Sequence, residues 1–148
     1  MILVSFEADY ADEFDVFGLK VFESDQAWRE YLNEWKEKKF KKQISEERLK
    51  EFFGVETNEE LELALKSFKK EFEEDGSFEK DYEGDLTTLL LVEGPWTEVE
   101  WYFGTNECII FNTWFEFRDC FEIITEDENA IKTLTRTWYG TEKGHFPS

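Results

Sequence analysis

Residues 106–124 read NECIIFNTWFEFRDCFEII and form the most aromatic and apolar run of the chain. Successive side chains of a β-strand point to opposite faces of its sheet, and this run is apolar on both alternating faces. One face would carry Ile109, Phe111, Phe115 and Phe117, and the other Cys108, Ile110 and Trp114. Because strands covered on both sides show such near-continuous apolar runs, the sequence predicts a central strand here. The remaining elements should cover it.

Two strands are predicted before this run, and its last five residues are predicted to form a separate final strand. Residues 86–92 read LTTLLLV, an apolar run typical of a strand buried on both faces. Residues 97–103 alternate apolar and polar side chains, the period of a strand with one wet face. Strands from residue 86 to residue 117 should therefore form an antiparallel meander. Arg118 and Asp119 would mark a turn or bulge before a final strand over residues 120–124.

The first half of the chain predicts a hairpin and then helices. Residues 2–7 and 17–22 alternate with the strand period on either side of a polar turn. Three amphipathic helices should follow. The first carries Trp28, Tyr31, Leu32 and Trp35 on one face, and the next two cover residues 45–53 and 58–72. Thr57 and Glu60 have the spacing of a capping box at the start of the third helix.

The end of the chain favours a closing helix. Ala130, Ile131, Leu134 and Trp138 recur on one helical face, and Gly140 would end the helix. Alternating threonines at positions 133, 135 and 137 leave a strand as the alternative. The predicted fold class is α+β, with a mostly antiparallel sheet packed against three to four helices. An N-terminal hairpin and a C-terminal meander would supply that sheet.

The composition indicates a single acidic domain over residues 1–148. Hydrophobic residues make up 41% of the chain and aromatic residues 18%, which is enough for a large core. With 36 Asp and Glu against 17 Lys and Arg, the formal net charge is −19. Such a field repels phosphate, so no direct binding to nucleic acid or to an anionic membrane is expected. The acidity fits either a generic solubility surface or a surface for a basic protein.

The residue types that most catalytic and cofactor sites need are scarce. The usual general base is histidine, and the only one is His145, which we expect in an exposed or locally packed tail. The glycines form no phosphate-binding pattern. Cys108 and Cys120 lack the spacing of zinc or redox motifs and should be buried, reduced thiols. We therefore expect no enzymatic activity, no cofactor and no metal.

Two remaining features bear on partners and location. Lysines cluster over residues 36–42, where they complement the macrodipole at the end of the first helix; contact with an acidic partner is the alternative. The first residues show no basic leader or cleavage site, and no apolar run is long enough to span a bilayer. We expect a cytoplasmic protein.

Carboxylates are the only plentiful reactive groups. A facing pair could serve as general acid and base on a glycoside, or could hold Ca²⁺ or Mg²⁺, although no EF-hand spacing occurs. A solvated sheet face is the simpler interpretation. A binding surface explains the same residues better, because acids steer a basic protein toward the site and a few aromatics anchor it. The predicted partner-binding residues are Glu98, Glu100, Tyr102, Trp114, Glu116, Asp119 and Glu122.

The overall pattern resembles the immunity proteins of bacterial polymorphic-toxin and contact-dependent inhibition systems. The resemblance lies in a small acidic α+β chain with strands first, helices in the middle, and aromatic-rich segments such as TEVEWYF and ECIIFNTWFEF. It implies a monomeric cytoplasmic antidote that binds a basic toxin domain, often a nuclease, and masks its active or substrate-binding surface. Two alternatives stay open, namely a small carboxylate-based enzyme or ligand-binding domain, and a nucleic-acid mimic that inhibits a DNA-binding protein.

Overall fold

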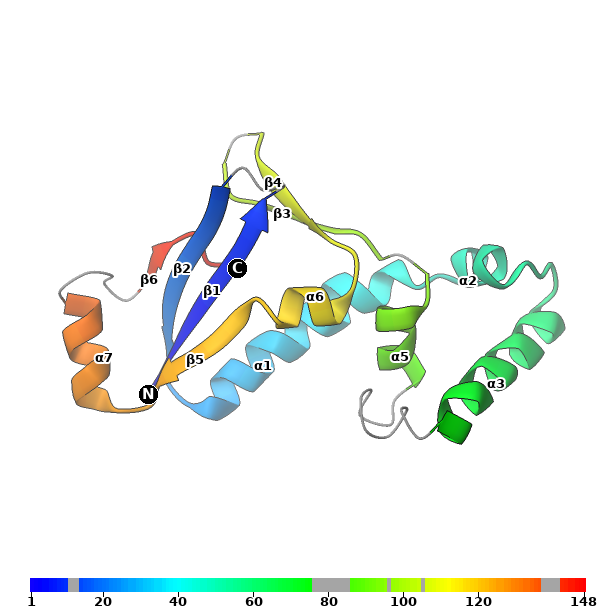
Figure 1. Ribbon diagram of the computed structural model, residues 1–148, viewed down its shortest axis with the longest axis horizontal. Helices are drawn as coiled ribbons and strands as arrows, with labels where there is room; N and C mark the ends of the chain where they lie inside the picture. Colours follow the sequence, from blue (N-terminus) through cyan, green and yellow to red (C-terminus); the bar gives the residue numbers. More distant parts are fainter. Residues whose placement is uncertain (11–13, 76–85, 96, 105, 137–141) are drawn as a thin grey trace.

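The structure, a computed structural model, describes residues 1–10, 14–75, 86–95, 97–104, 106–136 and 142–148. It confirms an α+β fold with antiparallel sheets. Figure 1 shows an elongated molecule with the larger sheet toward one end and helices α2, α3 and α5 at the other. The strands are β1 (Ile2–Tyr10), β2 (Phe14–Phe22), β3 (Val99–Tyr102), β4 (Cys108–Phe111), β5 (Phe121–Thr125) and β6 (Glu142–Gly144). The α-helices are α1 (Asp25–Trp35), α2 (Glu46–Phe53), α3 (Asn58–Asp75), α5 (Leu86–Glu93), α6 (Trp114–Arg118) and α7 (Glu128–Leu134).

The predicted N-terminal hairpin is confirmed and forms the centre of a four-stranded sheet. Strands β1 and β2 pair from Ile2 opposite Phe22 to Tyr10 opposite Phe14, and the strand order is β5-β1-β2-β6. Even-numbered β1 residues such as Val4 and Phe6 pack toward α1, because that face carries the large apolar side chains. On the opposite face, Leu3 packs with Ile131 of α7. The sheet is therefore covered on one side by α1 and partly covered on the other by α7.

Helix α1 begins at a serine cap, and its helical path extends through the lysine cluster in which the sequence placed the end of this helix. The Ser24 hydroxyl accepts a hydrogen bond from the Ala27 amide at 3.1 Å. After Trp35 the helical path continues through a π turn, Lys36–Phe40, and a 3₁₀ turn, Lys41–Gln43. This extension places the fully buried Phe40 against Trp114 and Phe117. The lysine cluster thus lies on a helical extension.

Helices α2, α3 and α5 pack around a separate apolar cluster built on Leu49, Leu61 and Leu90. The prediction of helices over 45–53 and 58–72 is confirmed, and the Thr57 hydroxyl caps α3 by accepting from the Glu60 amide at 3.1 Å. The prediction of a strand over 86–92 is wrong, because this segment is helix α5. Four consecutive residues of α5 are buried, so its sequence is apolar around the whole helix. Apolar runs this short fit a buried helix as well as a buried strand.

The meander is reduced to one hairpin, in which Val99 of β3 pairs with Phe111 and Tyr102 pairs with Cys108 of β4. The 106–124 run is also not a single central strand. It divides into β4, helix α6 and β5, and β5 pairs with β1 in the other sheet. The Thr113 hydroxyl accepts from the Glu116 amide at 3.1 Å, and the Glu116 carboxylate accepts from the Asn112 amide at 3.0 Å. These capping bonds start a helix inside the apolar run.

The last described segment returns to the core of the sheet. Strand β6 pairs Gly144 with Gly18 of β2, and Gly144 has a φ of 72°. A Cβ atom on Gly144 would lie 2.0 Å from the Phe17 carbonyl oxygen, so only glycine fits there. The Phe146 ring then packs against Phe6 and Phe121, and the Tyr31 hydroxyl donates to the Pro147 carbonyl.

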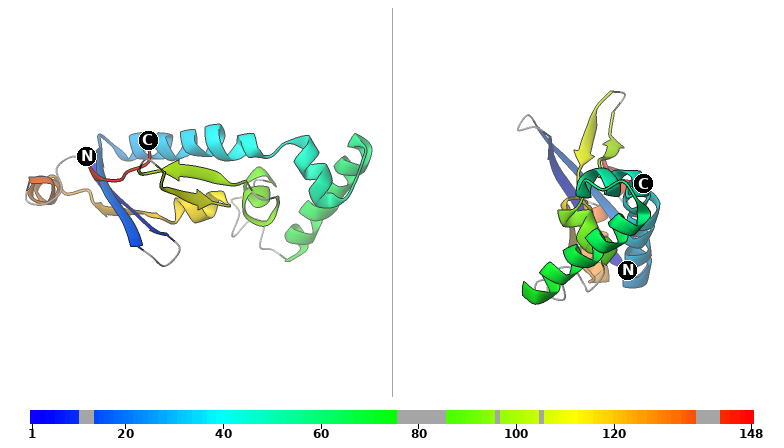
Figure 2. Two further views of the ribbon diagram at one scale, coloured as in Figure 1. Left: turned by 90° about the horizontal axis from the view of Figure 1, so that it is seen from above. Right: turned by 90° about the vertical axis from the view of Figure 1, so that its right-hand side faces the viewer.

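The left view in Figure 2 shows α7 (orange) and α3 (green) at opposite ends of the long axis, with the sheets and α1 between them. The closing helix is confirmed as α7 over Glu128–Leu134, while the predicted contributions of Trp138 and Gly140 lie outside the described residues. Within the described residues, none of the helices has the length and apolar character needed to cross a bilayer.

Candidate functional site

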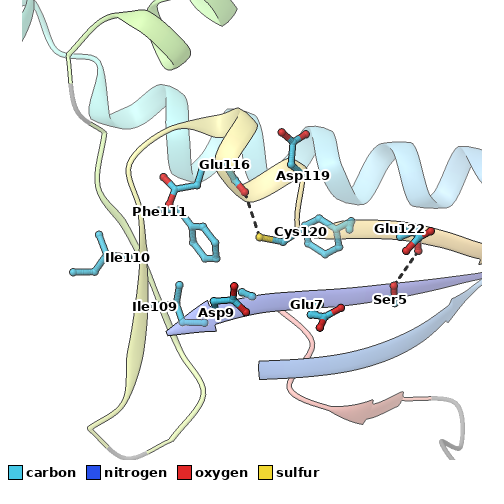
Figure 3. A pocket seen from close by; sticks show the side chains of 12 residues that line it. Ser5, Glu7, Asp9, Ile109, Ile110, Phe111, Glu116, Asp119, Cys120 and Glu122 are labelled. Atoms are coloured by element: carbon cyan, nitrogen blue, oxygen red, sulfur yellow. Dashed lines mark hydrogen bonds between the residues drawn. The ribbon is translucent and has the colours of Figure 1, made fainter. Parts of the chain in front are cut away.

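An acidic hollow of about 500 Å³ opens where the C-terminal half of β1, helix α6 and strand β4 meet. Figure 3 shows its side chains coming from several separate segments. We define the acidic hollow by its carboxylates, which are Glu7 and Asp9 from β1, Glu116 from α6, Asp119 at the end of α6, and Glu122 from β5. Segments more than 100 residues apart in sequence therefore supply one concentration of negative charge.

The strand period explains why Glu7 and Asp9 reach this hollow. Ser5, Glu7 and Asp9 alternate with the apolar residues of β1 that pack toward α1, so they lie on the opposite face of the sheet. Ser5 is opposite Glu122 of β5, and its hydroxyl donates to the Glu122 carbonyl at 3.4 Å. The register between β1 and β5 therefore places Glu122 on the same face as Glu7.

Helix α6 and the two residues after it supply Glu116, Asp119 and the sulfur of Cys120. The Glu116 carboxylate caps the start of the helix, while Asp119 follows its last residue. The Cys120 thiol donates to the Glu116 carbonyl at 3.3 Å, and the Glu7 amide donates to the Cys120 carbonyl at 2.9 Å. These two bonds join α6 to β1 and hold the acidic side chains around the opening.

Strand β4 gives the hollow an apolar side, lined by Ile109, Ile110 and Phe111. Ile109 and Phe111 are buried, whereas Ile110 has 47% of its surface exposed. Ile110 is the cross-strand partner of Glu100 on β3. Side chains directly opposite each other in an antiparallel pair lie on the same face. The exposed face of the β3–β4 hairpin is thus continuous with the hollow.

That hairpin face presents three of the predicted binding residues, all of them exposed: Glu98, Glu100 and Tyr102. The Tyr102 hydroxyl donates to the Glu100 carboxylate at 2.5 Å. This hydrogen bond and the nearby negative charge raise the pKa of Tyr102, so the phenol stays protonated. Tyr102 therefore presents an aromatic ring next to a carboxylate, which is the combination expected of a polar-aromatic contact surface.

Among the described residues, Arg118 is the one cation that pairs with a carboxylate of the hollow. In the described part of the chain, the lining includes no Lys, Arg or His. Arg118 lies 3.6 Å from the Asp119 carboxylate and also packs over the Phe115 ring at 3.9 Å. No other ion pair is described for the five carboxylates of the acidic hollow. Most of the described ion pairs join residues four apart on single helices, as in Lys41–Glu37 at 2.6 Å.

The negative charge around the hollow affects the pKa values of Asp9 and Cys120. The pKa of Asp9 is raised, first by a hydrogen bond with the Asp15 side chain and then by the charge of that carboxylate. Burial raises the pKa of Cys120 to about 12, and the charges of Glu116 and Asp119 add to the effect. A thiol in this state is a poor nucleophile. Both cysteines are free, as predicted, although each is half-buried instead of fully buried.

The structure separates the predicted site residues into three groups. Glu116, Asp119 and Glu122 come together in the hollow, and Glu98, Glu100 and Tyr102 lie on the adjoining hairpin face. Trp114 is only 5% exposed and packs against Phe40 and Phe117, so it is a core residue instead of a surface anchor. Sequence reasoning missed Glu7 and Asp9. Their alternation with apolar residues in β1 is the signal that could have identified them.

The described residues offer little for other chemistry. None of their His, Cys, Asp and Glu side chains form a group of three or more suited to a metal ion. His145 is exposed; its amide donates to the Phe17 carbonyl, and its ring is 5.5 Å from that of Phe103. The lysine cluster forms ion pairs within its own helix, including Lys38 with Glu34 at 3.9 Å.

The comparisons with known proteins provide no relatives for this chain. No family model matches it, and neither a curated protein nor a solved structure shows significant similarity. The functional interpretation therefore depends on the acidic hollow and its surroundings.

Proposed function

We propose that this protein is an acidic, non-catalytic binding protein whose partner is a basic protein. The observation that carries the proposal is the acidic hollow, where five carboxylates line one opening. Among the described residues that line it, none is Lys, Arg or His. A lysine or arginine side chain entering it would form charge-assisted hydrogen bonds. Glu100 and Tyr102 would extend the contact onto the hairpin face.

The specific form that we propose is an immunity-type inhibitor acting in the cytoplasm. The net charge of −19 would accelerate encounter with a basic toxin domain, and the hollow would then occupy cationic side chains that the toxin needs for its substrate. A nuclease is a suitable target, because its substrate-binding residues must be cationic to hold phosphate. Exposed apolar groups beside the acids, such as Ile110, would contribute desolvated contact area.

A binding role suits the hollow better than acid–base catalysis. A glycosidase needs two carboxyl groups on either side of its substrate, one of them with a raised pKa. Asp9 has a raised pKa, but its cause is Asp15, which does not line the hollow. The other carboxylates that line the hollow come from β1, from α6 with the residue after it, and from β5. A basic side chain of the partner could contact carboxylates from more than one of these segments.

A co-expression experiment tests the inhibitor form. The protein encoded by the gene next to this one would be produced in a sensitive cell with and without the acidic protein, and growth would be followed. We expect the neighbour to be toxic alone and harmless in the pair. If the neighbour is toxic and the pair is equally toxic, the inhibitor form is wrong for that partner. A complex formed by the purified proteins in a one-to-one ratio would show that protection is stoichiometric.

A further inference from the structure

Strand β5 is an edge strand of the four-stranded sheet, and none of the described strands pairs with its outer side. The strand order is β5-β1-β2-β6, so β5 pairs with β1 on one side only. Exposed sheet edges readily pair with another chain unless charged side chains, proline, a β-bulge or a covering element protects them. β5 reads FEIIT and contains neither lysine nor proline, and its Ile123 and Ile124 are 45% and 43% exposed. The register of β5 against β1 shifts between the Ile123–Val4 and Thr125–Leu3 pairs, so residues 121–123 pair regularly.

The register of β5 fixes which backbone groups point to this edge. The Cys120 carbonyl accepts from the Glu7 amide, and Glu122 lies opposite Ser5 in the same register. Backbone groups of successive strand residues point alternately to the two neighbouring strands. Because Cys120 and Glu122 point toward β1, the N–H and C=O groups of Phe121 and Ile123 point to the uncovered edge.

A groove runs beside this edge, between β5 and α1. Its volume is about 530 Å³, and its apolar lining residues are Trp28 and Leu32 from α1 together with Phe121 and Ile123 from β5. Arg118, Asp119 and Glu122 complete the lining, and the Arg118 guanidinium lies 3.6 Å from the Asp119 carboxylate. Ile123 is opposite Val4, whose side chain lies on the face that packs toward α1. An added strand would therefore place every second side chain against the apolar side chains of this groove.

The remaining side chains of an added strand would meet the acidic face. Glu122 points to the opposite face of the sheet from Ile123, since successive strand residues alternate. Asp119 and Glu122 line both the groove and the acidic hollow, so the two are continuous. The residues after β5 continue the negative charge with Glu126, Asp127 and Glu128.

We propose that the edge of β5 binds an extended segment of the basic partner, in which apolar and basic residues alternate. The apolar side chains would enter the α1–β5 groove, the basic ones would face Glu122 and the hollow, and the backbone would pair with Phe121 and Ile123. This inference rests on the proposed function for the basic character of the partner. A second copy of this chain is a poor occupant, because each copy carries a net charge of −19.

The test uses a fluorescent peptide of alternating lysine and valine, with both ends blocked, and measures its affinity by anisotropy. Two N-methylated forms of this peptide block either all valine amides or all lysine amides. Strand pairing uses one edge of the peptide, so one form should lose at least about tenfold in affinity while the other form binds. Amide hydrogen exchange should slow at residues 121 and 123. No binding of the unmodified peptide up to about 1 mM would overturn the inference.

The second part of the test compares variants of the protein in binding the same peptide. Ile123→Pro removes the edge donor and Ile123→Ala keeps it, so the proline variant should bind the peptide more weakly than the alanine variant. A triple variant, Glu7→Gln with Asp9→Asn and Glu116→Gln, changes acids that line the hollow but not the groove. If both methylated peptides bind equally and only this triple variant weakens them, the strand-pairing inference is wrong while the proposed function stands. A stable dimer that Ile123→Pro abolishes would assign the edge to a second copy and also overturn the inference.

Discussion

The ring of Phe6 in β1 meets the ring of Trp101 in β3 edge to face, with 4.9 Å between their centroids. This contact joins the four-stranded sheet to the β3–β4 hairpin, since both rings belong to the largest core cluster. The same cluster includes Phe111 of β4 and Phe117 of α6. The position of the hairpin beside the acidic hollow therefore depends on aromatic packing between the two sheets.

Replacing Trp101 by alanine should destabilise the fold strongly. The indole is buried, and its removal would leave a cavity between the sheets, at a cost of about 3–5 kcal/mol in the free energy of unfolding. Tyr102 is the matched control, because it is the next residue of the same strand and is 58% exposed. Tyr102→Ala should change the unfolding free energy by no more than about 0.5 kcal/mol. Urea denaturation measures both, and equal losses would contradict the packing described here.

Replacing two buried threonines by valine should change the free energy of unfolding in opposite directions. The Thr88 hydroxyl in α5 has no described hydrogen-bond partner, whereas the Thr97 hydroxyl donates to the Asn112 carbonyl at 2.7 Å. Thr88→Val should raise the unfolding free energy by about 1 kcal/mol, because it removes a buried group without a partner. Thr97→Val should lower it by about 1 kcal/mol. A loss of stability in Thr88→Val comparable with that in Thr97→Val would show that the Thr88 hydroxyl is satisfied.

Asp15→Asn should stabilise the protein at neutral pH but not in acid. The pKa of Asp9 is raised by its pairing with Asp15, so the folded chain binds this proton more tightly than the unfolded chain. Repulsion between the two ionised carboxylates is therefore fully present above the folded pKa of Asp9, and it is relieved as the pH falls through that value. The melting temperature of Asp15→Asn should exceed that of the wild type at about pH 7, and the gain should shrink at about pH 3.

Glu23→Gln provides the control for charge alone, because Glu23 is an exposed residue just after β2. It should change the melting temperature little at either pH. A gain in Asp15→Asn that persists undiminished in acid would rule out its origin in the Asp9 carboxylate.

Cys120 should be alkylated slowly in the folded protein. Its pKa of about 12 leaves very little thiolate at about pH 8, and the thiol also donates to the Glu116 carbonyl. Reaction with iodoacetamide, followed by mass spectrometry of peptides, should be at least about tenfold slower than in urea-unfolded protein. A Cys120 that reacts equally fast in both states would contradict the burial of the sulfur beside the acidic hollow.

The sequence predicted the elements whose periodicity is long and uninterrupted. Alternation identified the β1–β2 hairpin, and apolar residues at helical spacing identified α1, α2 and α3. It failed for 86–92, because Thr88 to Leu91 are buried around the whole of α5 and such a run carries no period. It also failed for 106–124, where the Thr113 cap and Glu116 interrupt the apolar run with a short helix.

The sequence predicted only those residues of the candidate site that lie close together along the chain. Glu116, Asp119 and Glu122 lie close in sequence, so their proximity could be expected before the fold was known. Glu7 and Asp9 join them only because β5 pairs with β1, a contact between residues more than 110 positions apart. The prediction placed Trp114 on the same sheet as the acidic residues, whereas the capped helix α6 turns this ring into the core.

The most direct test of the central claim compares two charge-matched variants in capture from a lysate of the native cell. The hollow variant carries Glu7→Gln, Asp9→Asn and Glu116→Gln, and the control carries Glu59→Gln, Glu62→Gln and Glu71→Gln on exposed positions of α3. Each removes three negative charges and takes the net charge from −19 to −16. Capture would be run at about 0.05 M and about 0.5 M salt, where the screening length differs about threefold.

We predict that the wild type and the α3 control retain one basic protein in a one-to-one ratio, more strongly at low salt, and that the hollow variant loses it. Mass spectrometry would identify the protein, and calorimetry with the purified pair would give the affinities. Equal loss in both variants would mean that only total charge matters, and equal retention would mean that the hollow is not the binding site. Either result would contradict the account.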